Sequence, residues 1–217
     1  MTAEQFINPR AARERRIMKI IASVITLAVA VTAGFPQLAH AERVRSPRVP
    51  TDLQVLPPYR GFLVGHATGT QNYICLPSGT SFAWTLFTPQ ATLFEDNENQ
   101  IITHFLSANP IEGGVARASW QHSRDTSTVW AVATDIYTLP DFVAPGAIPW
   151  LKLHVVGAQD GPNGGDKLTP AVFIQRINTA GGLAPTTGCS ASIDVGKKAL
   201  IPYKADYYFY KYGNGDN

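Results

Sequence analysis

The stretch GFLVGHATGTQNYICLPSGTSFAWTLFTPQATLF, residues 61–94, decides the fold class. Its apolar runs are short and are interrupted repeatedly by Gly, Pro, Ser, Thr or Asn, a pattern typical of strands joined by tight turns. Residues 71–76 carry apolar side chains on both strand faces, which is typical of a central strand in a two-layer structure. The interrupted pattern recurs in ASWQHSRDTSTVWA, residues 118–131.

The remainder of the chain extends this pattern and lacks a long apolar run at helical period after residue 41. A parallel α/β fold would need crossover helices. We therefore predict an all-β domain of about ten short strands, forming an antiparallel β-sandwich or a closed β-barrel. The expected strands are 62–66, 71–76, 82–87, 91–94, 100–105, 115–121, 126–134, 150–156, 168–177 and 203–212.

The N-terminal region has the layout of a secretory signal peptide. A basic start precedes an apolar run from Ile20 to about Gly34, and Ala39-His40-Ala41 is a small-x-small cleavage signature. We expect residues 1–41 to be removed after Ala41, residues 42–58 to form an extended Pro-rich lead-in, and residues 59–217 to form one β domain. An uncleaved membrane anchor is the alternative, although a span needs about 20 apolar residues.

The distribution of charged residues along the chain argues against a nucleic-acid partner and against membrane insertion. Residues 1–41 hold five of the 18 basic and two of the 16 acidic residues, which leaves 13 basic and 14 acidic residues in the exported part. The positive net charge of the whole chain therefore belongs to the signal segment. We expect no nucleic-acid partner and no stable membrane insertion after cleavage. The expected location is secreted or periplasmic.

The two cysteines, Cys75 and Cys189, both lie in the exported part. In an oxidising compartment the pattern favours a single disulfide between them. A reactive thiol at Cys75 is the alternative, but no His or Lys adjoins it in sequence.

Several segments together resemble one family over most of the exported chain. They are GHATGTQNYIC, FAWTLFTPQATLF, HSRDTSTVWA, APGAIPWL, FIQRINTAGGLAPTTGC and IPYKADYYFYK. The set resembles the domain-of-unknown-function 3455 family, whose members are secreted proteins of bacteria and fungi. The resemblance implies no particular chemistry, because that family has no established activity.

A candidate site lies around two histidines. His104 stands near the end of an expected strand, and His122 follows Trp120-Gln121 beside the turn that contains Arg124. The functional interpretation is a ligand pocket in which His104, Trp120, His122 and Arg124 meet. The alternative is that both histidines are structural residues at the edge of the core.

The C-terminal run offers a second set of candidates. Alternation on a strand places Tyr208, Tyr210 and Tyr212 on one face, and Tyr208 and Tyr210 are candidate ligand-binding residues. A last strand packed on both sides is the alternative.

Motifs for specific reactions are missing from the sequence. No histidine pair has a metal-ligand spacing, and no G-x-S-x-G, S-x-x-K, H-E-x-x-H or G-x-G-x-x-G occurs. We expect no metal and no cofactor, and whether the protein is an enzyme stays open.

Three hypotheses follow. The first is a non-catalytic binding module for a small ligand, a glycan or a protein. The second is a metal-assisted or hydrolytic enzyme with a site around His104 and His122, and the third is a structural envelope or stress protein.

Overall fold

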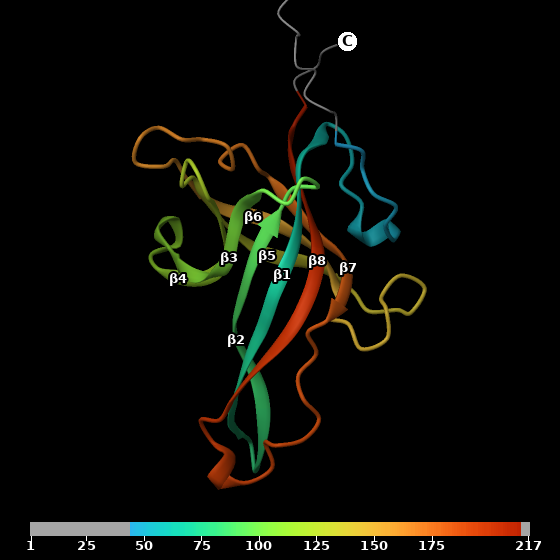
Figure 1. Ribbon diagram of the computed structural model, residues 1–217, viewed down its shortest axis with the longest axis vertical. Helices are drawn as coiled ribbons and strands as arrows, with labels where there is room; N and C mark the ends of the chain where they lie inside the picture. Colours follow the sequence, from blue (N-terminus) through green and yellow to red (C-terminus); the bar gives the residue numbers. More distant parts are fainter. Residues whose placement is uncertain (1–43, 214–217) are drawn as a thin grey trace, which may run out of the picture. The chain divides into compact units, whose positions relative to one another are not determined.

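The computed structural model describes residues 44–213 and contains a closed, eight-stranded antiparallel β-barrel (Figure 1). The all-β prediction is confirmed, with the barrel as the form adopted. The strands are β1 (Tyr59–Ser78), β2 (Ser81–Phe94), β3 (Gln100–Asn109), β4 (Val115–His122), β5 (Thr128–Tyr137), β6 (Trp150–Gln159), β7 (Phe173–Gly181) and β8 (Lys198–Tyr212). The described residues also form three short 3-10 helices: η1 (Thr51–Leu53) before β1, η2 (Pro110–Glu112) between β3 and β4, and η3 (Ser192–Asp194) between β7 and β8.

The strands follow an up-and-down order, in which each strand pairs with its sequence neighbours. The barrel closes where β1 pairs with β8, from Tyr59 opposite Tyr212 to Ile74 opposite Lys198. Closure leaves no free edge along this sheet, which removes the unpaired backbone groups that an open sheet exposes.

The structure has eight strands where the sequence predicted about ten, because two expected breaks lie inside long strands. Residues 62–66 and 71–76 both belong to β1, and residues 82–87 and 91–94 both belong to β2. Gly69 does not form a turn but allows close packing, since a Cβ at this position would lie 2.1 Å from the Gln90 carbonyl oxygen. Pro89 lies opposite Gln71, close to a register shift between Asn72 and Tyr73.

The interior of the barrel is packed tightly toward one end. Its fully buried apolar residues come from strands on all sides of the barrel and include Leu93, Ile102, Val129, Ile174 and Phe209. These side chains belong to one hydrophobic cluster that also contains Trp120 and Tyr207.

The segment before β1 packs on the outside of the barrel. Val49 and Leu53 belong to a second cluster with Trp150 and Ile177. The Gln175 amide on the outer face of β7 donates a hydrogen bond to the Leu53 carbonyl oxygen at 2.5 Å. The Pro-rich lead-in is therefore attached to the domain over its described part.

The predicted disulfide is present between Cys75 and Cys189, whose Cα atoms are 5.5 Å apart. It joins β1 near the β1–β2 hairpin to the connection between β7 and β8. The backbone supports the same junction, because the Cys75 amide donates to the Lys197 carbonyl oxygen at 2.9 Å.

The expected signal segment, residues 1–41, lies outside the described residues. Within the described part, no helix has the length and apolar character that a membrane crossing requires.

Replacing Cys189 with Ser should destabilise the domain. The two cysteines are 114 residues apart, and on the chain-entropy model a loop of this size contributes about 4–5 kcal/mol. Urea unfolding of the oxidised wild type and of the Cys189→Ser variant measures the difference. An unchanged midpoint in the variant would show that the disulfide does not stabilise the fold.

Candidate functional site

The barrel encloses a cavity of about 210 Å³ to which all eight strands contribute. For comparison, an apolar cavity of about 150 Å³ accommodates benzene. An eight-stranded barrel is just wide enough either to be filled by its own side chains or to hold one small ligand. The residues that line the cavity are Gln71, Leu86, Pro89, His104, Leu106, Ala118, Trp120, Ala131, Ala133, Leu151, Leu153, Arg176 and Tyr207.

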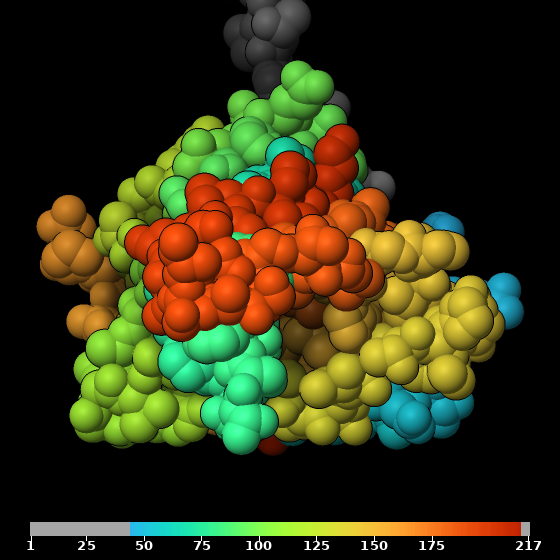
Figure 2. Space-filling model, turned by 90° about the horizontal axis from the view of Figure 1, so that it is seen from below, coloured from blue at the N-terminus to red at the C-terminus, as the bar shows by residue number. Residues whose placement is uncertain are grey.

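The cavity opens at the end opposite the tightly packed interior. Along β3 the inward side chains change from Ile102, which is 0% exposed, through His104 at 3% to Leu106 at 40%. Leu86 on β2 is 49% exposed and also lines the cavity. Figure 2 shows the hollow at this end, bordered by the β1–β2 hairpin, the chain around residues 183–197 and the connection before β6.

Small side chains leave this space unfilled. Ala118 on β4 and Ala131 on β5 are cross-strand partners, and Ala133 lies two residues farther along β5 toward the mouth. Side chains two residues apart on a strand face the same side. Three alanines therefore line one wall, where larger residues would have closed the interior.

His104 is held rigidly in the cavity wall. Its ring stacks on the Trp120 ring, with centroids 4.3 Å apart and planes inclined by 11°. Nδ1 donates a hydrogen bond to the Ser119 carbonyl oxygen at 2.9 Å. Burial lowers the pKa of His104 to about 3, so the imidazole is neutral near pH 7 and Nε2 carries a lone pair.

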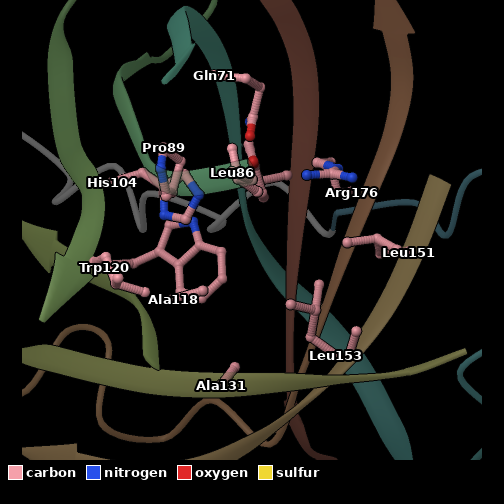
Figure 3. A pocket seen from close by; sticks show the side chains of 13 residues that line it. Gln71, Leu86, Pro89, His104, Ala118, Trp120, Ala131, Leu151, Leu153 and Arg176 are labelled. Atoms are coloured by element: carbon pink, nitrogen blue, oxygen red, sulfur yellow. The ribbon is translucent and has the colours of Figure 1, made fainter. Parts of the chain in front are cut away.

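Three other side chains present N–H groups that the protein leaves unpaired. Within the described residues, Trp120 Nε1, Gln71 Nε2 and Arg176 Nε are buried and have no hydrogen-bond partner. Trp130 differs, because its indole donates to the Ser107 hydroxyl at 2.9 Å. In the view of Figure 3, the Gln71 side chain lies between the His104–Trp120 pair and Arg176. A buried unpaired donor is unfavourable, so three around one cavity indicate a polar guest or water.

Arg176 supplies the positive charge of the cavity. Its Nη2 donates to the Pro149 carbonyl oxygen at 2.9 Å. Among the described residues, no carboxylate lies within ion-pair distance of the guanidinium. The Arg176 charge also reaches Tyr207, where burial raises the pKa of the phenol and the guanidinium opposes that rise.

Of the predicted site residues, His104 and Trp120 come together in the cavity. His122 is also buried but serves the β4–β5 turn, where its Nδ1 accepts from the Asp125 amide at 3.2 Å. Burial lowers the pKa of His122. Arg124 lies exposed in the same turn and does not line the cavity.

The two predicted tyrosines lie on the outer face of β8. Tyr210 is 1% exposed, and its hydroxyl donates to Gln175 Oε1 at 2.5 Å. Tyr208 is half-buried and packs against the outer cluster around Trp150. Neither residue lines the interior cavity, and Tyr212 is the exposed tyrosine of this face.

Sequence reasoning missed Gln71, Arg176 and Tyr207 as cavity residues. Arg176 directly follows Gln175, so both faces of β7 carry a polar residue at this point, and alternation alone does not identify the inner face. The missing information was the closure of the barrel, which places Arg176 inside and Gln175 outside.

A second, more open hollow is lined by His66, Phe94 and acidic residues of the β2–β3 loop. The His66 ring bridges two carboxylates, with Nδ1 2.6 Å from Asp206 Oδ1 and Nε2 2.9 Å from Asp96 Oδ1. Burial opposes the charged imidazole, but Asp206 and then Asp96 outweigh burial and raise the pKa of His66. This cluster links β1, β8 and the hairpin loop.

No group of three or more His, Cys, Asp or Glu side chains in residues 44–213 is arranged to hold a metal ion.

Replacing His104 with Phe should reduce the loss of folding stability that the wild type shows as pH decreases from 7 to 4. The unfolded chain binds a proton at His104 near pH 6.5, whereas the folded chain binds it only near pH 3. Wild-type stability therefore falls as pH decreases through this window, by at most about 1.4 kcal/mol per pH unit for one proton. Urea unfolding between pH 4 and 7 compares the slopes. Equal slopes would mean that folding does not shift the pKa of His104.

Replacing His66 with Gln should change the folding stability with the opposite dependence on pH. Because the folded-state pKa of His66 is raised, its stabilising effect is complete below about pH 6.5 and is lost as pH rises through the folded pKa. The stability difference between wild type and variant should therefore shrink as pH rises above about 6.5. An NMR titration should also show that Asp206→Asn lowers the pKa of His66 more than Asp96→Asn, since the Asp96 side chain is 98% exposed.

Comparison with known proteins places the chain in a family. A family model described as a protein of unknown function, DUF3455, matches residues 59–211, from the first residue of β1 almost to the last residue of β8. No curated protein and no solved structure gave a match. Since the matched region covers well over half of the chain and contains the whole barrel, the protein belongs to the DUF3455 family.

Proposed function

We propose that this domain is a non-catalytic binding protein that holds a small, largely apolar molecule inside its barrel. The observation that carries the proposal is the unfilled interior, a cavity of about 210 Å³ lined from all eight strands. Ligand sites in β-barrels lie in the mouth of the barrel, and they combine an apolar lining with a few fixed polar groups.

The exposed side chains at the mouth support this proposal. Leu86 and Leu106 are large and apolar, yet they are 49% and 40% exposed while lining the cavity. A ligand seated at the mouth would remove part of this surface from water, which is favourable at about 25 cal/mol per Å².

We also propose that the domain works outside the cytoplasm. The Cys75–Cys189 disulfide supports export, because such bonds persist in oxidising compartments. The signal-like pattern of residues 1–41 in the sequence supports the same location.

A neutral aromatic probe tests ligand binding. Benzyl alcohol, added to the ¹⁵N-labelled protein purified from an oxidising compartment, should shift the Trp120 indole N–H signal in a saturable manner. The Trp120→Phe variant assigns that signal. The signals of Trp84 and Trp130 should move less, because their indoles are bonded to Thr187 and Ser107.

Replacing Ala131 with Leu should reduce benzyl alcohol affinity about tenfold or more, because the added carbons occupy the cavity. Ala180→Leu is the matched control, since Ala180 is exposed on β7 and does not line the cavity. Both variants are first checked for folding by thermal unfolding. Saturable binding that survives in a folded Ala131→Leu variant would place the ligand elsewhere and refute the interior site.

A further inference from the structure

We infer that the molecule bound in the barrel is a small carboxylate, with its anionic group beside Arg176 and its apolar part toward Ala118 and Ala131. This inference rests on the proposed function and adds the chemical class of the ligand and its orientation.

The first observation is an Arg without a carboxylate partner in an apolar cavity. Arg176 Nη2 donates to the Pro149 carbonyl oxygen, the guanidinium also lies beside the Tyr207 hydroxyl, and Nε is buried without a partner in the described structure. Arg117 on β4, by contrast, has a carboxylate partner, since its Nη2 lies 2.7 Å from Glu112 Oε1. A partly buried cation is unfavourable unless an anion or ordered water compensates it.

The second observation is an excess of donors. Besides Arg176, the Trp120 indole and the Gln71 amide present unpaired N–H groups, and both residues are almost fully buried, at 1% and 2% exposed. An indole N–H only donates, and a guanidinium has no acceptor. A guest that pairs with these N–H groups must bring acceptor atoms, whereas Nε2 of the neutral His104 offers an acceptor to a water or to a donor group of the guest.

The third observation is that the cavity lining carries a positive charge and no negative charge. No acidic side chain is among the 13 residues that line it. Because one cation is present and a guanidinium pairs with a planar carboxylate through two parallel hydrogen bonds, a monoanionic carboxylate is the best match. The neutral His104 adds no second positive charge.

The apolar residues that line the rest of the cavity determine the chemistry of the other part of the ligand. Leu151 and Leu153 on β6 and the three alanines on β4 and β5 offer no hydrogen bonds from their side chains. The ligand is therefore amphiphilic, and the cavity volume limits it to about the size of a single substituted ring or a short acyl chain.

A matched pair of probes tests this inference. Benzoate and benzamide have nearly the same shape, but only benzoate is an anion at pH 7. Isothermal titration of the full-length, disulfide-bonded protein should give benzoate an affinity about ten- to a hundredfold higher than benzamide, as expected for hydrogen bonds between charged groups.

Arg176→Met should remove the preference for benzoate while leaving benzamide binding within a few-fold of wild type. Arg176→Lys should keep part of the preference, because it retains the charge but not the bidentate geometry. Arg45→Met is the matched control, since Arg45 is exposed and does not line the cavity. Thermal unfolding verifies that each variant is folded, and the wild-type preference alone tests the inference if Arg176→Met does not fold.

The outcomes separate the two proposals. If wild type binds benzyl alcohol or benzamide as tightly as benzoate, the interior site stands and the carboxylate inference is wrong. If a folded Arg176→Met variant keeps the benzoate preference, the anion lies elsewhere and the inference is again wrong. If no probe binds the wild type and Ala131→Leu changes nothing, both the carboxylate inference and the proposed function fail.

Discussion

The pairing of β1 with β8 is the constraint on which the rest of the structure depends. It joins the first and last strands of an eight-strand meander over almost the whole length of β1. Without it the sheet would expose two edges and its inward side chains would have no opposite wall. With it, Gln71 on β1 and Tyr207 on β8 face the same interior as Trp120 and Arg176. The cavity therefore exists only because the ends of the chain's β region meet.

Closure alone does not produce a cavity, because a barrel of this size can be filled by its own side chains. The division of the interior into a packed end and an open end follows from side-chain size. Leu93, Ile102 and Phe209 fill one end, whereas Ala118 and Ala131 stand in register near the other. Under the proposed function, the packed end stabilises the fold and the open end holds the ligand. This explains how the protein tolerates unpaired donors at the open end while the packed end maintains the fold.

Much of the fold was predictable from sequence because β-strands and turns leave local signals. Short apolar runs, the absence of helical periodicity and two cysteines in the segment expected to be exported predicted an all-β domain with one disulfide. The predicted number of strands was less accurate, since Gly and Pro are typical of turns, whereas Gly69 and Pro89 lie within the long strands β1 and β2. Whether a Gly ends a strand or allows a neighbour to approach depends on contacts that are distant in sequence.

The site was only partly predictable for the same reason. His104 and Trp120 are adjacent on paired strands, directly opposite each other in register, so local pattern was sufficient to group them. Arg176 comes from β7, and its significance depends on the identity of the inner face and on the absence of a carboxylate opposite it, neither of which is local. A charged residue between Gln175 and Ile177 has no distinguishing pattern in the sequence. In the folded barrel it is the cation of a cavity that also contains unpaired N–H groups, and the proposal of a bound anion depends on this property.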